Sequence, residues 1–103
     1  MSSYRVVISE GAENDLIGIY QFILENTGSP TLALERVDHL FEQCHKLHRF
    51  PHRGIQRNDI RPGLRLLPIE RRSLIAYIID AEVVRVTNIF HAGQDFEALL
   101  RAP

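Results

Sequence analysis

Apolar residues recur at helical spacing in the first part of this chain. The first stripe consists of Ala12, Leu16, Ile19, Tyr20 and Ile23. Ser9 precedes it as a suitable N-cap, and Gly28 follows at a position where glycine commonly ends a helix. The pattern therefore predicts a helix over residues 10–26.

A second helical stripe begins directly after this glycine. Ser29-Pro30 provides an N-cap followed by a proline at the first helical position. The stripe consists of Ala33, Val37, Leu40, Phe41, Cys44 and Leu47. Pro51 ends the pattern, because proline cannot continue a helix. The short link between the two stripes predicts an antiparallel αα-hairpin.

The rest of the chain favours strands. Residues 4–8, 64–69, 72–79 and 82–90 are rich in β-branched and other apolar residues, and Asp80-Ala81 is expected to turn between the last two runs. Residues 51–63, which mix proline, glycine and arginine, are expected to form a surface loop. The sequence thus predicts one α+β domain over residues 1–103, with order β-α-α-β-β-β. The αα-hairpin packs on one face of a small, mostly antiparallel sheet, and Pro68 lies at an edge or a bulge.

The strand predicted over residues 72–79 is apolar on both faces. Leu74, Ala76 and Ile78 alternate with Ile75, Tyr77 and Ile79. Two helices can cover only one face of the sheet. The other face is left for the C-terminal segment, residues 96–100, or for a partner chain.

Charge divides the chain into three parts. Residues 1–45 carry a net charge of −5, residues 46–72 carry +6 and residues 73–103 carry −2. We call the basic residues of the middle part the cationic belt; they are Lys46, Arg49, Arg53, Arg57, Arg61, Arg65, Arg71 and Arg72. Such a belt favours a polyanion or an acidic peptide as partner, or it forms an unliganded solvated surface.

Several kinds of site and location are disfavoured by the sequence. The longest apolar run, residues 74–79, is too short to span a bilayer, and no signal segment is recognised, so a soluble cytoplasmic protein is expected. Cys44 lies on an apolar stripe and is expected to be a buried thiol. His45, His48 and His52 have a spacing that suits metal binding poorly, because Pro51 interrupts the helix. We expect no metal and no cofactor.

Short motifs along nearly the whole chain resemble the ParE branch of the ParE/RelE superfamily, the toxins of bacterial type II toxin–antitoxin modules. They are Ala12-x-x-Asp15-Leu16-x-x-Ile19, Ala33 with Leu47, Pro51-x-x-Gly54, Gly63-Leu64-Arg65, Arg72-x-x-Ile75-x-Tyr77 and Ile89-x-His91-x-x-x-Asp95. The order and spacing of these motifs on the predicted frame carry the resemblance.

The resemblance implies a toxin that poisons DNA gyrase without catalysis and is neutralised by a cognate, ParD-like antitoxin wrapped around it. The antitoxin would cover apolar grooves and basic residues. The partner-binding candidates are Arg53, Arg57, Arg61, Arg65, Arg72, Tyr77 and His91.

RelE-like toxins, which cleave mRNA on the ribosome, supply the alternative. Arg65 and Arg72 would then hold a phosphate, and His91 would act as general acid. The lysines and the C-terminal tyrosine of the RelE-type site have no counterpart, since Lys46 is the only lysine and no tyrosine follows Tyr77. His91 equally suits a partner contact or a structural role in the turn before Asp95. A third alternative is a degenerate member that binds an antitoxin and is not toxic.

Overall fold

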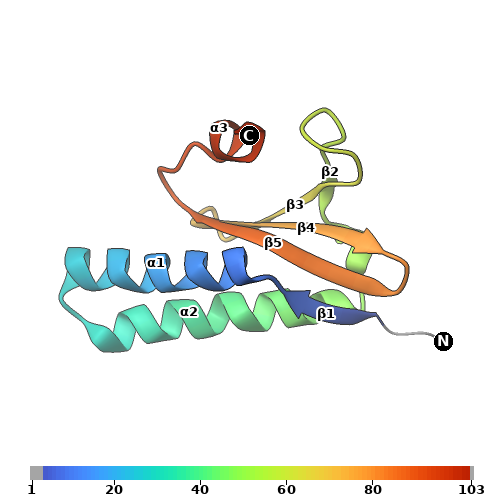
Figure 1. The fold of residues 1–103 in the computed structure, drawn as a ribbon. Helices are drawn as coiled ribbons and strands as arrows, with labels where there is room; N and C mark the ends of the chain where they lie inside the picture. Colours follow the sequence, from blue (N-terminus) through green and yellow to red (C-terminus); the bar gives the residue numbers. More distant parts are fainter. Residues whose placement is uncertain (1–3, 103) are drawn as a thin grey trace.

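A computed structural model describes residues 4–102 as a five-stranded sheet with helices on both sides (Figure 1). The strands are β1 (Arg5–Ile8), β2 (Ile55–Gln56), β3 (Arg65–Ile69), β4 (Ser73–Asp80) and β5 (Val83–His91). The α-helices are α1 (Glu10–Thr27), α2 (Pro30–His45) and α3 (Phe96–Arg101), and short 3₁₀ turns span Lys46–His48 and Pro51–Arg53.

The sheet order is β1-β5-β4-β3-β2. β1 runs parallel to β5, and the other neighbours are antiparallel. Because α1 and α2 lie between β1 and the other strands in sequence, β1 can join the edge of the sheet in parallel orientation. This arrangement confirms the predicted α+β class with an αα-hairpin on one face of a mostly antiparallel sheet. The parallel edge strand and the short β2, within the predicted loop, are additions to it.

The helix boundaries follow the capping residues. The Ser9 hydroxyl accepts a hydrogen bond from the Ala12 N–H at 3.1 Å, and the Ser29 hydroxyl accepts one from the Leu32 N–H at 3.1 Å. Gly28, with a φ of 69°, ends α1 in the left-handed conformation that glycine adopts without a steric penalty. The first helix is predicted to within one residue, since α1 ends at Thr27. The second is predicted too long, because α2 ends at His45 and residues 46–48, with Leu47 of the predicted stripe, form a 3₁₀ turn before Pro51.

The main core lies between the αα-hairpin and the sheet. It is formed by the helix residues Leu16, Ile19, Leu40 and Cys44 with Ile75, Tyr77, Val84, Val86 and Ile89 of the sheet, among others. Burial raises the pKa of the Cys44 thiol to about 12, as its place in this core requires. The predicted buried thiol is confirmed.

The opposite face of the sheet carries a second apolar cluster. Leu66, Ala76, Phe90 and Leu64 are buried there, and Leu100 of α3 packs on them. The partly buried residues that pack against this cluster are Ile60, Leu74, Ile78 and Phe96. Figure 1 shows α3 on the side of the sheet away from α1 and α2. Of the two predicted covers for this face, the C-terminal segment is the one found, and the alternation of β4 between two apolar faces is confirmed.

A β-bulge in β5 fixes how α1 sits on the sheet. The register shifts between the pairs Ala76–Asn88 and Tyr77–Val86, so Thr87 is the extra residue. The Ser9 hydroxyl donates to the Thr87 carbonyl at 3.2 Å, and the Ile89 N–H donates to Asp15 Oδ2 at 2.9 Å. The start of the first helix is therefore tied to the irregular part of β5.

The two hairpin turns use non-glycine residues with positive φ. Glu70 and Arg71, between β3 and β4, have φ values of 52° and 61°, and Ala81 has 55°. The β4–β5 turn is formed by residues 81–82 because Asp80 still pairs with Val83, one residue later than predicted. Pro68 is exposed in β3 beyond the two residues that pair with β2, which agrees with the predicted edge position. None of the helices within residues 4–102 has the length and apolar character needed to cross a membrane.

Candidate functional site

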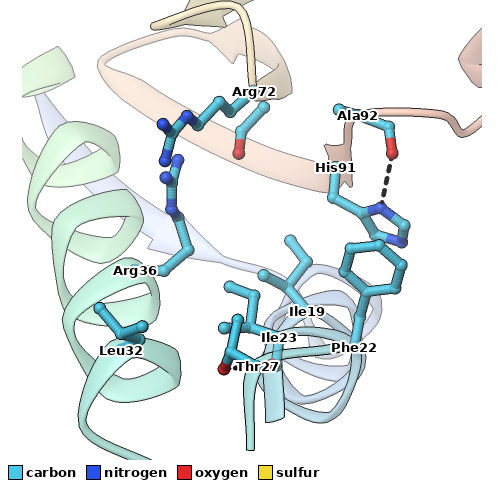
Figure 2. A pocket seen from close by; sticks show the side chains of 10 residues that line it. Ile19, Phe22, Ile23, Thr27, Leu32, Arg36, Arg72, His91 and Ala92 are labelled. Carbon is cyan, nitrogen blue, oxygen red and sulfur yellow. Dashed lines mark hydrogen bonds between the residues drawn. The ribbon is translucent and has the colours of Figure 1, made fainter. Parts of the chain in front are cut away.

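A pocket of about 280 Å³ opens between the αα-hairpin and the end of the β4–β5 hairpin. Its lining residues come from α1 (Ile19, Phe22, Ile23 and Thr27), α2 (Leu32 and Arg36) and the sheet end (Arg72, Ser73, His91 and Ala92). We call it the hairpin pocket. Its lining is mostly apolar, and its charged side chains are Arg36 and Arg72, which point toward one another in Figure 2. It thus combines an apolar surface with cationic groups.

Arg72 and His91 are brought together by strand pairing. Ser73 pairs with His91, and the Ala92 N–H donates to the Arg72 carbonyl at 2.7 Å. The His91 ring stacks on Phe22 with 4.2 Å between centroids, and its Nδ1 lies 3.0 Å from the Ala92 carbonyl oxygen (Figure 2). Strand pairing therefore places Arg72 and His91 next to one another at the edge of the pocket.

Arg65 lies elsewhere. In β3 it pairs with Tyr77, whereas Ile69 pairs with Ser73 beside Arg72. Ile69 lies four residue steps after Arg65 along the extended strand, a distance of about 13 Å. The Arg65 guanidinium donates to the carbonyls of His52 at 3.0 Å and Gly54 at 2.9 Å. The three residues proposed for RNA cleavage are therefore not assembled into one site here.

Two further arginines of the cationic belt hold α3 in place. Arg57 donates to Asp59 at 2.9 Å and to Glu97 of α3 at 3.0 Å, and Arg61 donates to the Leu100 carbonyl at 3.0 Å. Arg101 in turn donates to Asp59 at 3.1 Å. The hydrogen bonds from Arg57 lower the pKa of Asp59 to about 2. The charges of Arg57 and Arg61 are thus directed toward the protein's own C-terminal helix.

Tyr77 is fully buried and cannot be reached from the surface in this conformation. Its hydroxyl donates to the Pro51 carbonyl at 2.7 Å and accepts from the Gly54 N–H at 2.9 Å. These bonds tie the start of the 51–63 loop to the sheet. Tyr77 is therefore a structural residue here. It could affect a partner bound at the surface only by holding this loop in position. Arg53, by contrast, is exposed.

The histidines with possible metal spacing have other neighbours. His45 packs edge-on against Phe41, and His52 packs edge-on against Tyr4. Within residues 4–102, no group of three His, Cys, Asp or Glu side chains is arranged to hold a metal ion.

Arg36 and Phe22 are pocket residues that the sequence reasoning missed. Arg36 stands three residues after Ala33 and four before Leu40, which are both fully buried. A charged residue at helical spacing from two core residues must lie beside the buried stripe. That position is the signal that marks Arg36 in the sequence.

Comparison with known proteins gives consistent results. A family model described as the ParE toxin of the type II toxin–antitoxin system, parDE, matches residues 6–96. Toxin ParE3 of Caulobacter vibrioides is 29% identical over 98 residues, covering 93% of this chain and 94% of that protein.

Solved structures show the same fold. A chain of the chromosomal ParDE toxin–antitoxin system from P. aeruginosa has a TM-score of 0.75 at 24% identity, covering 86% of this chain and 96% of that chain. The toxin–antitoxin complex RelBE2 from Mycobacterium tuberculosis contains a chain with a TM-score of 0.63 at 20% identity. The match covers 91% of this chain and 97% of that chain.

Proposed function

Since this chain belongs to the ParE toxin family of type II toxin–antitoxin systems, we propose that it inhibits DNA gyrase and that a cognate, ParD-like antitoxin holds it inactive. The family match over residues 6–96 carries the proposal, and it confirms the resemblance read from the motifs. Gyrase inhibition is the activity that this resemblance implies. The protein would act in the cytoplasm, with residues 1–103 working as one domain.

The separation of Arg65 from Arg72 and His91 supports binding rather than catalysis. A ribonuclease needs its cationic groups and its acid around one phosphate, whereas an inhibitor that traps an enzyme needs only a complementary surface. Among the residues predicted to bind partners, we propose Arg53, Arg72 and His91 as direct contacts. Arg57, Arg61 and Arg65 are hydrogen-bonded within the protein.

The test is a supercoiling assay with purified gyrase, relaxed plasmid and the full-length protein in excess. We expect loss of supercoiling and accumulation of cleaved DNA, both reversed when purified antitoxin is added first. Unchanged supercoiling with no trapped cleaved DNA would contradict the proposal. In cells, induction of the protein alone should trigger the DNA-damage response while transcripts remain intact.

The ribosome-dependent ribonuclease remains a second candidate because Arg72, directly before β4, lies beside His91 at the end of β5. Rapid transcript cleavage on induction, without early DNA damage, would favour it. His91→Ala then tests the general acid, because cleavage that persists in this variant removes His91 from that role. Soluble expression with neither DNA damage nor transcript cleavage would favour a non-toxic member that only binds antitoxin.

A further inference from the structure

The hairpin pocket contains cations without matching anions. Its lining residues include Arg36 and Arg72 but no Asp or Glu. The turn carboxylate closest in sequence to Arg72, that of Glu70, pairs with His39 instead. Within residues 4–102 neither guanidinium takes part in an ion pair with a carboxylate. The free protein therefore holds two guanidinium groups of like charge that point toward one another (Figure 2).

A donor in this pocket also lacks an acceptor. Nη1 of Arg36 is buried and has no hydrogen-bond partner within residues 4–102. A buried donor left unpaired destabilises the state that contains it, and two guanidiniums pointing at one another repel. An anion placed between Arg36 and Arg72 would relieve both effects. A planar carboxylate fits this role, since it accepts parallel hydrogen bonds from a guanidinium on each side.

The remainder of the pocket selects an apolar group. Ile19, Ile23 and Leu32 line it, and the stacked pair of Phe22 and His91 closes one side. Its volume of about 280 Å³ is just below the range of about 300–1,000 Å³ for drug-sized ligands. The space therefore suits one or two side chains better than a nucleotide. A nucleic-acid backbone would also leave the apolar lining unfilled.

We infer that the hairpin pocket binds an acidic–apolar anchor of a partner peptide, with a carboxylate held between Arg36 and Arg72 and a neighbouring apolar side chain filling the space against Ile19, Ile23 and Leu32. That the peptide belongs to the antitoxin rests on the function proposed above. The chemistry of the pocket does not rest on it. Arg36 and Arg72 act as the carboxylate clamp, and Phe22 and His91 form a wall of the apolar part.

The test uses the full-length ¹⁵N-labelled protein and blocked dipeptides as probes. N-acetyl-Leu-Asp-amide should shift the backbone resonances of Phe22, Ser73 and Ala92. N-acetyl-Leu-Asn-amide, which lacks the negative charge, should bind at least about tenfold more weakly. Equal binding of the two dipeptides, or no shift at the pocket with the acidic one, would overturn the inference.

Variants assign the effect to the clamp. Arg36→Gln and Arg72→Gln should each weaken binding of the acidic dipeptide about tenfold. Arg49→Gln, which removes an exposed arginine that does not line the pocket, should leave it unchanged. If Arg36→Gln does not fold, Arg36→Lys keeps the charge and removes the planar fork, so binding should still weaken. Unchanged binding in the folded Arg36 and Arg72 variants would contradict the clamp.

Inorganic phosphate is the probe for the alternative ligand, a nucleic-acid backbone. If phosphate shifts the pocket resonances at lower concentration than the acidic dipeptide, the site prefers a nucleic-acid backbone and the inference fails. The spectra involve neither gyrase nor antitoxin. A negative supercoiling assay would thus contradict gyrase as the target without affecting the inference about the pocket. A negative titration would contradict only the inference about the pocket.

Discussion

Tyr77 shows how one side chain can serve two layers of this protein. Its ring lies in the main core, while its hydroxyl carries both hydrogen bonds to the loop that follows α2. Gly54 has an ordinary φ of −73°, but a Cβ at this position would lie only 2.6 Å from the tyrosine oxygen. Glycine is required there by close approach rather than by backbone conformation.

Tyr77→Phe should lower the free energy of unfolding by about 1–3 kcal/mol, because it leaves the Gly54 N–H and the Pro51 carbonyl without partners inside the protein. Urea denaturation measures this change. Tyr20→Phe is the matched control, since Tyr20 is only partly buried on α1, and it should change stability by less than about 0.5 kcal/mol. Equal effects in the two variants would show that the buried hydroxyl is not special.

Asp15 is a second residue whose role depends on its surroundings. Burial raises the pKa of this carboxyl, although hydrogen bonds from the Ile89 N–H and from Asn88 oppose the shift. The folded protein therefore holds a proton on Asp15 more tightly than the unfolded chain does. As pH rises above the ordinary value of 3.8, the ionised carboxyl should make a growing unfavourable contribution to stability until the raised folded pKa is passed.

Asp15→Asn tests this contribution, because the amide oxygen can still accept from Ile89 but does not ionise. We expect the stability of the natural protein to fall relative to that of the variant between pH 3.8 and neutral pH. Urea denaturation of both proteins across this range gives the difference. A difference that is constant with pH, or that moves in the opposite direction, would contradict the assigned shift.

At the scale of elements, the β3–β4 turn is closed by residues that disfavour its geometry. Glu70 and Arg71 both occupy the left-handed region, which costs a residue with a Cβ about 1–2 kcal/mol. The turn carries Arg72 to the hairpin pocket, and Glu70 joins it to α2 through His39. The contact with α2 and the pairing of Ile69 with Ser73 hold this turn in place.

Arg71→Gly should raise the free energy of unfolding by up to about 1 kcal/mol, because glycine adopts a φ of 61° without strain. The same substitution at exposed Arg49, where φ is −94°, should not stabilise the protein. Thermal or urea denaturation of both variants distinguishes them. A loss of stability in Arg71→Gly as large as in Arg49→Gly would mean that the left-handed turn stores no strain.

At the scale of the whole molecule, one sheet separates two apolar clusters, and helices cover one of them much more extensively than the other. The αα-hairpin covers the larger one, while the six residues of α3 cover the smaller one. So short a helix is not stable alone. Its position depends on Leu100 and on the ion pairs that join Asp59, Arg57 and Glu97. This end of the molecule should therefore open before the main core does.

Asp59→Asn should increase hydrogen exchange of the amides of Leu99 in α3 and of Ala102 directly after it, which donate to Asp95 and Ala98, while the β4 and β5 amides stay protected. The pKa of Asp59 is lowered to about 2, so its stabilising effect is full above 3.8 and is lost as pH falls toward 2. The variant and the natural protein should then show the same hydrogen exchange at α3 at low pH. Asp38→Asn, an exposed change on α2, is the control. Equal α3 protection in all three proteins at neutral pH would contradict this role of Asp59.

The sequence by itself determined the parts of this protein that depend on neighbouring residues. Ser9, Ser29 and Gly28 mark the helix ends because capping acts over a few residues. The run of apolar residues in β4 gives the sheet two apolar faces, because successive side chains of a strand point to opposite faces. Motif order along the chain was also sufficient for the family, which the match over residues 6–96 confirms.

Only the tertiary structure decided where the charges go. The residues of the cationic belt lie within one stretch of sequence, yet their side chains go to different places. Arg57 and Arg61 donate to α3, and Arg65 donates to loop carbonyls. Arg72 points toward Arg36 of α2 (Figure 2). Arginine side chains are long and take whatever acceptor the packing of distant segments supplies. The sheet order brings His91 to Arg72 and separates both from Arg65. Spacing along the chain does not contain these distances, because each one joins residues that meet only after the sheet has formed.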